Sequence, residues 1–572
     1  MDIKKYIDEK LAVVFTELDF DTSLAHTTFS DRIDIAHLQC NGAFAIAKSM
    51  HKNPLEIAQN IADALSVHFT EGEVSVARPG FVNIKLNDNI LCRIAKDIFD
   101  SNRLNLPALS KGETIVIDYG GANIAKPLHV GHLRSAIIGE SIKKLYKTFG
   151  YNTISDVHLG DWGLQMGLTI AQLMDDYDMS GYFESGKTRT PITLDMLDIC
   201  YPKASQRKKV DEEFYAIASE ITLKLQSGFA PYVNMWKEIC RVSLTDCRAL
   251  YEELGCDFDL WNGESTVNYL VPDVISDLKK KKLAYISDGA LVVDTTDDMP
   301  PAIILKNNGS QMYAITDIAT IVERMKKYNP QSIVYITGAR QELHFRQVFI
   351  VCEKAKFVSD KTHLVHIGYG TVNGKDGRPF KTRDGGAFKL RDLIDMVTAK
   401  AKEKILANND PVDNIDVLSK QVAMSAIKFG DLSNVIAKDY IFDVDKFTSF
   451  EGKTGPYIQY TGVRIKSLLS KAKWKENEFA VRGDMTEIKN IMLAYLRYLD
   501  AFKIAFADKN ISPICSSLYD LCSVYSNFYN NVKILSESDA VKKNTYLSVS
   551  YLVLKGIIFG ANIIGFEVPE KM

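Results

Sequence analysis

Two histidines three positions apart stand beside a lysine and a glycine in the stretch AKPLHVGHLRSAIIGE, residues 125–140. His129 and His132 could ligate a metal ion, bind phosphate, or lie on an ordinary helix surface. A zinc site needs a third and a fourth ligand, and neither an HExxH pattern nor a nearby cysteine pair supplies them. We therefore expect no bound structural metal, and the helix-surface interpretation stays open beside the phosphate one.

The elements around these histidines favour phosphate. The apolar run 115–117 predicts a buried parallel strand that ends at Gly120 and Gly121, and a helix is expected from about Val130 to Phe149. The histidines then fall at the first turn of this helix, where unpaired N–H groups and the positive end of the helix dipole attract anions.

Three further features suit a nucleoside triphosphate. Lys126 contributes a full positive charge, His129 and His132 contribute side-chain donors, and Gly131 has no side chain to obstruct a base or a backbone. Attack on an α-phosphate depends mainly on positioning and charge neutralisation, which these groups can provide.

The predicted elements divide the chain into three parts. Residues 1–108 mix short helical patterns with a strand-like run and are expected to form a small α+β domain. Residues 109–405 contain strand–helix–strand units typical of a Rossmann-like α/β core, with a helical insertion at about 168–260. Residues 406–572 are almost entirely helical, which predicts an all-α C-terminal domain.

The composition is that of an ordinary globular protein. The 572 residues are 46% hydrophobic and 25% charged, and the formal net charge is -3, so a nucleic-acid partner must be met by local basic patches. The nine cysteines include no Cys-x-x-Cys pair, which argues against a zinc ribbon or a disulfide scaffold and suggests a reducing compartment.

One apolar segment, residues 546–566, has the length of a membrane span. Lys555 lies near its middle, and a lysine there costs about 2.5–3.5 kcal/mol on insertion. We therefore expect a buried helix and no membrane partner. The N-terminal residues have neither a signal peptide's apolar core nor a transit-like composition, so the cytoplasm is the expected location.

The wider string NIAKPLHVGHLRSAIIG, followed by HLGDWGLQMG at residues 158–167, resembles the signatures of the arginyl-tRNA synthetases, a family of class I aminoacyl-tRNA synthetases. The likeness continues along nearly the whole chain, through YPKAS, GES, YAITDIA, TGARQELHFRQVF, YGTVNGKDGRPFKTRDGG, GKTGPYIQYTGVRIKS and FEVPEKM. It implies a ligase that uses ATP with Mg²⁺ to join L-arginine to arginine tRNA, in a chain expected to be monomeric. Lys571 departs from the arginine usual in the family's C-terminal tail.

The resemblance also implies an arginine site. A guanidinium is bound by carboxylates and planar acceptors arranged as a fork. Tyr313 and Asp317 are four positions apart, so on a helix they share a face, although they could also be an ordinary pair at a helix N-terminus. Asp118 could equally be a turn residue at a strand end. The positions that match family contacts to arginine are Asp118, Asn123, Tyr313, Asp317 and Gln341.

The second class I signature, KMSKS, departs from the family pattern. Its place is taken by PFKTR, residues 379–383, in which the usual second lysine is absent. We expect Lys126 to share the pyrophosphate charge with Lys381 or Arg383. The glycines nearby indicate a mobile loop that closes over ATP, with a non-catalytic basic hairpin as the alternative. The positions assigned to catalysis are Lys126, His129, His132, Lys381 and Arg383. Those assigned to ATP binding are Lys126, His129, Gly131, His132 and Phe380.

Contacts to tRNA are implied at both ends of the chain. The N-terminal domain resembles the family's tRNA-elbow-binding domain, with Asn41 and Phe44 at the contact. The helical C-terminal domain resembles the anticodon-binding bundle, where rings and arginine planes stack on unpaired bases. Its candidate contacts are Tyr457, Gln459, Tyr460 and Arg464. The alternative is that the tyrosines are core residues at helical spacing.

Three other functions share parts of this pattern. A pantothenate- or nicotinate-type nucleotidyl enzyme has the HxGH motif but would not need a long helical C-terminal domain. A non-catalytic tRNA-binding paralogue would have lost phosphate or substrate groups, which are all present here. A synthetase for another amino acid is disfavoured by the two acids, Asp118 and Asp317. The resemblance further implies that bound tRNA can be required for the first step.

Overall fold

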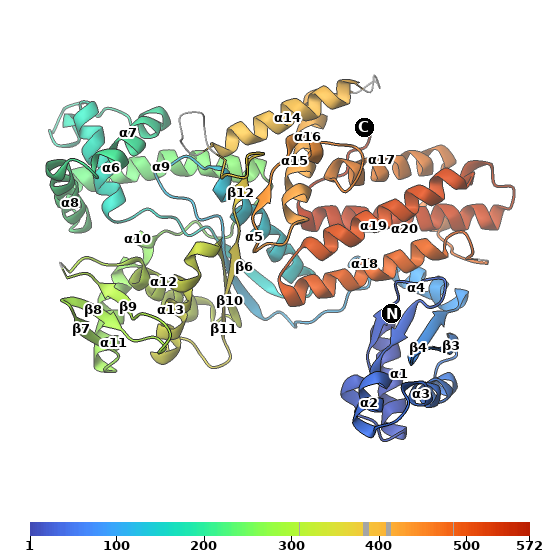
Figure 1. Cartoon of the computed structure of the whole chain (residues 1–572). Coiled ribbons are helices and arrows are strands. Elements are labelled where there is room, and N and C mark those ends of the chain that lie inside the picture. The colour runs from blue at the N-terminus through green and yellow to red at the C-terminus, as the bar shows by residue number, and fades with distance from the viewer. Residues whose placement is uncertain (308, 381–387, 408–412, 484) are drawn as a thin grey trace.

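The computed structural model describes residues 1–307, 309–380, 388–407, 413–483 and 485–572. At its centre lies a parallel four-stranded sheet with the order β11-β10-β5-β6 (Figure 1). Branched apolar side chains are buried along the central strands, as expected where helices cover both faces. The strands are β5 (Thr114–Asp118), β6 (Asn152–Asp156), β10 (Ser332–Gly338) and β11 (His363–Tyr369).

The strand order reverses beside β5, which pairs with β6 on one side and with β10 on the other. Open α/β sheets bind ligands at such a point, outside the carboxyl ends of the strands. The helix that follows β5 is α5 (Val130–Thr148), as the sequence predicts. The helices beside β10 are α12 (Tyr313–Tyr328) and α13 (Glu342–Lys354). This confirms the Rossmann-like core.

Two further units lie on the left of the sheet in Figure 1, one above the other. The expected helical insertion contains four helices: α6 (Leu164–Asp176), α7 (Leu194–Arg207), α8 (Glu212–Gln226) and α9 (Ala230–Glu253). A smaller unit follows, with an antiparallel sheet of order β7-β8-β9. Its elements are α10 (Glu264–Val267), α11 (Val271–Lys280), β7 (Ala284–Ser287), β8 (Ala290–Val293) and β9 (Ala302–Leu305).

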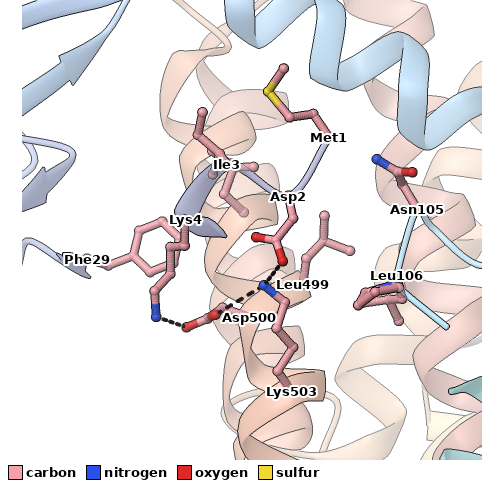
Figure 2. A pocket seen from close by; sticks show the side chains of 12 residues that line it. Met1, Asp2, Ile3, Lys4, Phe29, Asn105, Leu106, Leu499, Asp500 and Lys503 are labelled. Carbon is pink, nitrogen blue, oxygen red and sulfur yellow. Dashed lines mark hydrogen bonds and ion pairs between the residues drawn. The ribbon is translucent and has the colours of Figure 1, made fainter. Parts of the chain in front are cut away.

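The N-terminal domain is α+β, as expected, and its antiparallel sheet has the order β1-β2-β4-β3. Its elements are α1 (Ile3–Glu17), β1 (Thr27–Phe29), β2 (Leu38–Cys40), α2 (Gly42–Met50), α3 (Pro54–His68), β3 (Gly72–Ala77), β4 (Phe81–Leu86) and α4 (Asp88–Asp100). Charged side chains join this domain to the C-terminal helices. Figure 2 shows Lys4 and Lys503 at Asp500, and Lys503 also at Asp2.

The C-terminal part is a bundle of long helices, drawn in orange and red in Figure 1. Its elements are α14 (Leu390–Ala407), α15 (Ile415–Leu432), α16 (Val444–Phe447), α17 (Gly455–Ala472), α18 (Lys489–Asp508), α19 (Ser512–Asn531) and α20 (Ala540–Ile564). A short parallel pair, β12 (Val372–Asn373) with β13 (Tyr440–Ile441), links the core to this bundle. Position 405, where we expect the core to end, lies within α14.

Helix α20 contains the apolar segment that has the length of a membrane span. Within the described residues it is the one helix that meets that criterion, and 72% of its most apolar stretch is buried inside the protein. The Nζ of Lys555 donates to the backbone carbonyl of Phe99 at 2.6 Å and to that of Ile98 at 3.3 Å. The helix is therefore a core helix that packs on α4, α5, α17 and α19.

Candidate active site at the carboxyl edge of the sheet

The loop between β5 and α5 presents the two histidines at the first turn of the helix. His129 is the N-cap, and its Nδ1 accepts a hydrogen bond from the Gly131 amide at 3.1 Å. The Nδ1 of His132 accepts from the His129 amide at 3.0 Å. Both side chains thereby satisfy amide groups that the helix itself leaves unpaired.

Both imidazoles are neutral near pH 7. Burial lowers the pKa of His129 to about 4, with Lys126 acting in the same direction, and lowers the pKa of His132 well below its usual value. Because each Nδ1 is an acceptor, the hydrogen-bond network assigns the ring proton to Nε2. Each histidine can therefore offer an Nε2–H donor to a phosphate oxygen without carrying a charge.

Gly131 is required by the position of the His129 ring. A Cβ atom at residue 131 would lie 2.8 Å from Cε1 and 2.9 Å from Nδ1 of that ring. Lys126 is half-buried just before the turn, and burial lowers its pKa. The loop thus combines one lysine, two neutral donors and an open helix start, which is the composition of a phosphate site.

Hydrogen bonds hold α5 beneath the strand ends. Ser135 Oγ accepts from the Gly120 amide and donates to the Ile336 carbonyl, both at 2.8 Å. These bonds join α5 to two neighbouring strands of the sheet, because Gly120 follows β5 and Ile336 belongs to β10. The phosphate groups of the site are therefore fixed relative to the whole sheet.

The second signature lies beside the first. We call residues 381–387, which include Lys381 and Arg383, the signature loop. The backbone on either side of His129 pairs with residues 388–390, which directly follow it. Phe380, directly before that loop, is half-buried, and its ring lies 5.6 Å from that of Phe388. Lys381 and Arg383 lie outside the described residues. The structure therefore places residues 388–390 at the histidine turn, with Phe380 beside Phe388.

Two half-buried acids, Asp317 and Glu264, lie at the N-terminal half of α12, and we call them the acid cluster. Tyr313 is the first residue of the helix and is 66% exposed, and Asp317 lies one turn later. His344 Nε2 lies 2.5 Å from a carboxylate oxygen of Asp317. Glu264 begins α10, which packs against α12. Burial, and after it the charge of Asp317, raises the pKa of Glu264 to about 7. These acids can receive a guanidinium.

Asp118 is not the open carboxylate that we expect from the sequence. Its Oδ2 accepts from Arg324 Nη2 at 2.6 Å, and the same nitrogen donates to Asp156 Oδ2 at 2.8 Å. Both acids lie at strand ends, and all three side chains are buried. Burial raises the pKa of Asp118, whereas the pKa of Asp156 is held below its usual value. An internal guanidinium already occupies Asp118.

The two remaining arginine candidates lie on the surface of the same edge. Asn123 is exposed in the loop after β5, and its Oδ1 lies so close to Gly160 that a Cβ atom there would be 2.3 Å away. Gln341 is exposed at the end of a short 3₁₀ turn between β10 and α13. The structure thus brings all five candidates to the carboxyl edge of the sheet.

The candidate tRNA contacts divide into exposed and buried residues. The sequence predicts Gln459 at the RNA surface, and this prediction is wrong. The residue is 0% exposed, accepts from Ser425 Oγ at 2.7 Å and donates to the carbonyls of Gln421 at 3.2 Å and Glu567 at 2.6 Å. It joins α15, α17 and the C-terminal tail, and these tertiary contacts bury it.

The other candidates in α17 lie closer to the surface. Tyr460 is 40% exposed, and the guanidinium of Arg464 lies 4.7 Å from its ring and 5.1 Å from the ring of Tyr529. Tyr457 is half-buried, and its hydroxyl donates to Ser526 Oγ at 3.1 Å. Exposed rings beside an arginine plane can stack on unpaired bases.

In the N-terminal domain, Asn41 is the exposed N-cap of α2. Phe44 lies one turn later and packs edge-on against Phe81, with 5.0 Å between the ring centroids. Phe44 is half-buried, and Asn41 is the more accessible of the two. Among the residues that the structure describes, three or more His, Cys, Asp or Glu side chains nowhere gather as a possible metal site.

Comparison with known proteins decides the family. Residues 94–444 match the family model of the class I (R) tRNA synthetase catalytic domain, residues 1–86 that of the arginyl tRNA synthetase N-terminal domain, and residues 458–572 that of the DALR anticodon-binding domain. An arginine–tRNA ligase of Agathobacter rectalis is 42% identical over 99% of both chains, and one of Alkaliphilus oremlandii is 40% identical over 99% of both. This chain belongs to the arginyl-tRNA synthetase family.

Solved structures of the arginyl-tRNA synthetase family have the same fold. The enzyme of Plasmodium falciparum superposes with a TM-score of 0.84 at 25% identity, covering 100% of this chain and 99% of that one. The Thermus thermophilus enzyme superposes with a TM-score of 0.80 at 21% identity, and each chain is covered completely. Both of these enzymes therefore share the overall fold of this chain along its whole length.

Sequence reasoning missed several residues that the structure places in the site. Glu264 lies in the GES string, which resembles the family core, but the string alone assigns it no role. Arg324 lies on the face of α12 that points inward, where an arginine needs buried acids as partners. His158 has a positive φ of 37° in the HLGDW loop, and nearby acids raise its pKa to about 9 against the effect of burial. Spacing along the chain reveals none of these contacts.

Proposed function

We propose that this chain activates L-arginine with ATP to form arginyl-adenylate and then transfers arginine to the 3′ end of its tRNA. The observation that carries this proposal is the juxtaposition of a phosphate site and an acid cluster at one edge of the sheet. Full-length similarity to arginine–tRNA ligases supports the same activity. No observation favours a non-catalytic paralogue.

In the first step, an oxygen of the arginine carboxylate attacks the α-phosphorus of ATP. A carboxylate–phosphorus bond forms, the bond from the α-phosphorus to the bridging oxygen breaks, and pyrophosphate leaves with the electron pair. His129 and His132 donate Nε2–H bonds to the phosphate oxygens, and Lys126 neutralises charge. The nucleophile is already an anion at neutral pH, so no general base is required.

The acid cluster selects the substrate side chain. Glu264 and Asp317 face the guanidinium, and Tyr313 and Gln341 offer polar contacts at the rim. Arg324 already pairs with Asp118, so we assign Asp118 to the support of the site, or to the ammonium end of arginine together with Asn123. A neutral isostere such as citrulline brings no cation to the two half-buried acids, Glu264 and Asp317, and is rejected for that reason.

In the second step, a terminal ribose hydroxyl of tRNA attacks the carbonyl carbon of the adenylate, and AMP leaves. We place the anticodon near Tyr457, Tyr460 and Arg464, and the tRNA elbow near Asn41 and Phe44. Lys381 and Arg383 are proposed to bind the departing pyrophosphate with Lys126. Magnesium is proposed to enter on the ATP phosphates, which supply the hard oxygen ligands that it prefers.

The remaining expectations are proposals of the same kind. We propose that the chain acts as a cytoplasmic monomer without a membrane partner. We also propose a division into an elbow-binding domain at 1–108, a catalytic domain at 109–405 with its insertion at about 168–260, and an anticodon-binding domain at 406–572.

Arginine-dependent exchange of pyrophosphate into ATP tests the function. It is measured with and without arginine tRNA, and with lysine and citrulline in place of arginine. Exchange with arginine alone among the three supports the proposal, and a requirement for tRNA adds the coupling of the two steps. No exchange under either condition, from folded protein that binds tRNA, would replace the proposal with a non-catalytic role.

A further inference from the structure

One buried guanidinium links three parts of the chain behind the phosphate-binding histidines. Arg134 lies in α5 two positions after His132 and is 1% exposed. Its Nη1 donates to the carbonyls of Gly370 at 2.9 Å and Lys438 at 3.0 Å. Its Nε donates to Oδ1 of Asp431, a fully buried residue of α15, at 3.3 Å.

Gly370 and Lys438 lie at the base of the signature loop, where β12 pairs with β13. We call this base the loop root. Gly370 directly follows β11 and begins the segment that runs through β12 to Phe380. Lys438 lies just before β13, which pairs with β12. The rings of Tyr369 and Tyr440 lie 6.0 and 5.2 Å from the guanidinium carbon. One side chain therefore holds the loop root against the start of α5.

The third partner connects this arrangement to the helical bundle. Asp431 lies near the end of α15, which packs against α14 and α17. The buried side chain of Gln459 in α17 is hydrogen-bonded to Ser425 and to the backbone of Gln421, both in α15. Packed helices move as units, so a displacement of α17 reaches Asp431 through α15.

The ion pair between Arg134 and Asp431 is only half formed. Asp431 Oδ2 lies 3.1 Å from Nε but is not aligned to accept a hydrogen bond. Within the described part of the chain, Arg134 Nη2 is likewise buried without a hydrogen-bond partner. A guanidinium and a carboxylate can join through two parallel hydrogen bonds, and a small movement of α15 would complete that fork.

We propose that Arg134 is a positioning residue for ATP, which, with Asp431, makes the geometry of the phosphate site depend on the position of α15. Arg134 acts through its neighbours, because its guanidinium is enclosed by protein groups behind the histidines. The inference rests on the proposed function for the identity of ATP as the ligand. We call Arg134 and Asp431 the clamp.

Two variants separate positioning from stability. Arg134→Lys keeps the charge but cannot reach two carbonyls and Asp431 at once. The double variant Arg134→Met, Asp431→Leu replaces the clamp with apolar side chains, a change that buried ion pairs often tolerate without loss of stability. Arg241→Lys is the matched control, because Arg241 pairs with Glu238 on the exposed face of α9.

The dissociation constant of α,β-methylene-ATP is measured by calorimetry, together with the KM values for ATP and arginine in pyrophosphate exchange. We expect analogue binding to weaken at least tenfold and the KM for ATP to rise in both clamp variants. The KM for arginine stays within twofold, and the control is unchanged. Circular dichroism melting establishes that each variant is folded. If Arg134→Lys does not fold, the double variant alone tests the proposal.

Wild-type analogue binding by the folded double variant would overturn the proposal, because the clamp would then serve stability alone. A rise in both KM values would overturn it as well, since the effect would not be specific to ATP. Analogue binding needs no turnover. A wild-type chain that shows no exchange, with clamp variants that lose analogue binding, would therefore reject the proposed function and leave the clamp in place.

Discussion

At the residue scale, each histidine of the phosphate site has two separate tasks. His129 uses Nδ1 to cap α5 and leaves Nε2–H for a ligand. Amide side chains can separate the two tasks. An asparagine amide reaches the position of Nδ1 and can keep the cap, whereas a glutamine amide reaches the position of Nε2 and can keep the donor to the ligand.

We expect His129→Asn to keep the cap and to lower kcat for pyrophosphate exchange by about 10²-fold, the usual effect of losing one transition-state donor. His129→Gln should lose less activity but lower the free energy of unfolding by about 1 kcal/mol through loss of the cap. Exchange kinetics and urea unfolding measure the two effects. Equal rates in both variants would contradict the division of tasks.

Glu264 gives arginine binding a pH dependence. Burial raises its pKa to about 7, Asp317 and Asp161 act in the same direction, and His158 opposes them. The guanidinium binds the ionised carboxylate, so the KM for arginine should rise as the pH falls through 7, by about tenfold per pH unit well below it. Arginine itself stays cationic over this range.

The profile is measured by exchange kinetics between pH 5.5 and 8.5, with Glu264→Gln as the comparison. The variant should show a high KM that no longer varies with pH, because its side chain cannot ionise. A wild-type KM that is constant across this range would remove Glu264 from the arginine site.

At the element scale, Arg324 fixes α12, the helix that contains Tyr313 and Asp317, to the sheet. It reaches from α12 to the ends of β5 and β6, so Tyr313 and Asp317 are held in register with the phosphate loop. Arg324→Gln removes the guanidinium that Asp118 and Asp156 share and leaves these two buried acids with His158 as a neighbouring cation. We expect a loss of about 3 kcal/mol in the free energy of unfolding at pH 7.5, the low end of the cost of breaking a buried ion pair.

That loss should shrink at pH 5.5. Burial raises the pKa of Asp118 even beside Arg324, and removal of the guanidinium raises it further. Protonation of Asp118 at lower pH therefore favours the folded variant. Urea unfolding at the two pH values measures the difference. The control is Arg346→Gln, because Arg346 lies on the exposed side of α13, 3.9 Å from Asp298. An equal loss at both pH values would mean that the acids are not the cause.

The same elements show what the sequence can predict. The strand 115–117, the glycines after it and the paired histidines act over a few residues, so α5 and its phosphate site could be placed from the sequence. Arg324 and Asp118 are 206 positions apart, and only the folded sheet brings them together. Gln459 was assigned to the wrong face, because its burial depends on the C-terminal tail that packs over α17.

At the scale of the whole molecule, the N-terminal domain is held to the bundle by charge as well as by apolar contacts. Asp500 of α18 lies 3.0 Å from Lys4 and 3.6 Å from Lys503, and Lys503 lies 2.5 Å from Asp2 (Figure 2). These side chains are partly buried, so salt screens them less than it screens surface pairs. The domain's orientation therefore depends on a small ionic network.

We expect Asp500→Asn to loosen this junction, because Lys4 and Lys503 then share Asp2 as their remaining counter-charge in the network. The KM for tRNA in aminoacylation should rise roughly fivefold, which corresponds to about 1 kcal/mol, while the KM values for arginine and ATP stay unchanged. Hydrogen exchange in α1 should accelerate. Asp360→Asn, in an exposed pair with Lys356, is the control. If amide exchange in α1 rises but the KM for tRNA does not, the orientation of the N-terminal domain does not contribute to tRNA binding.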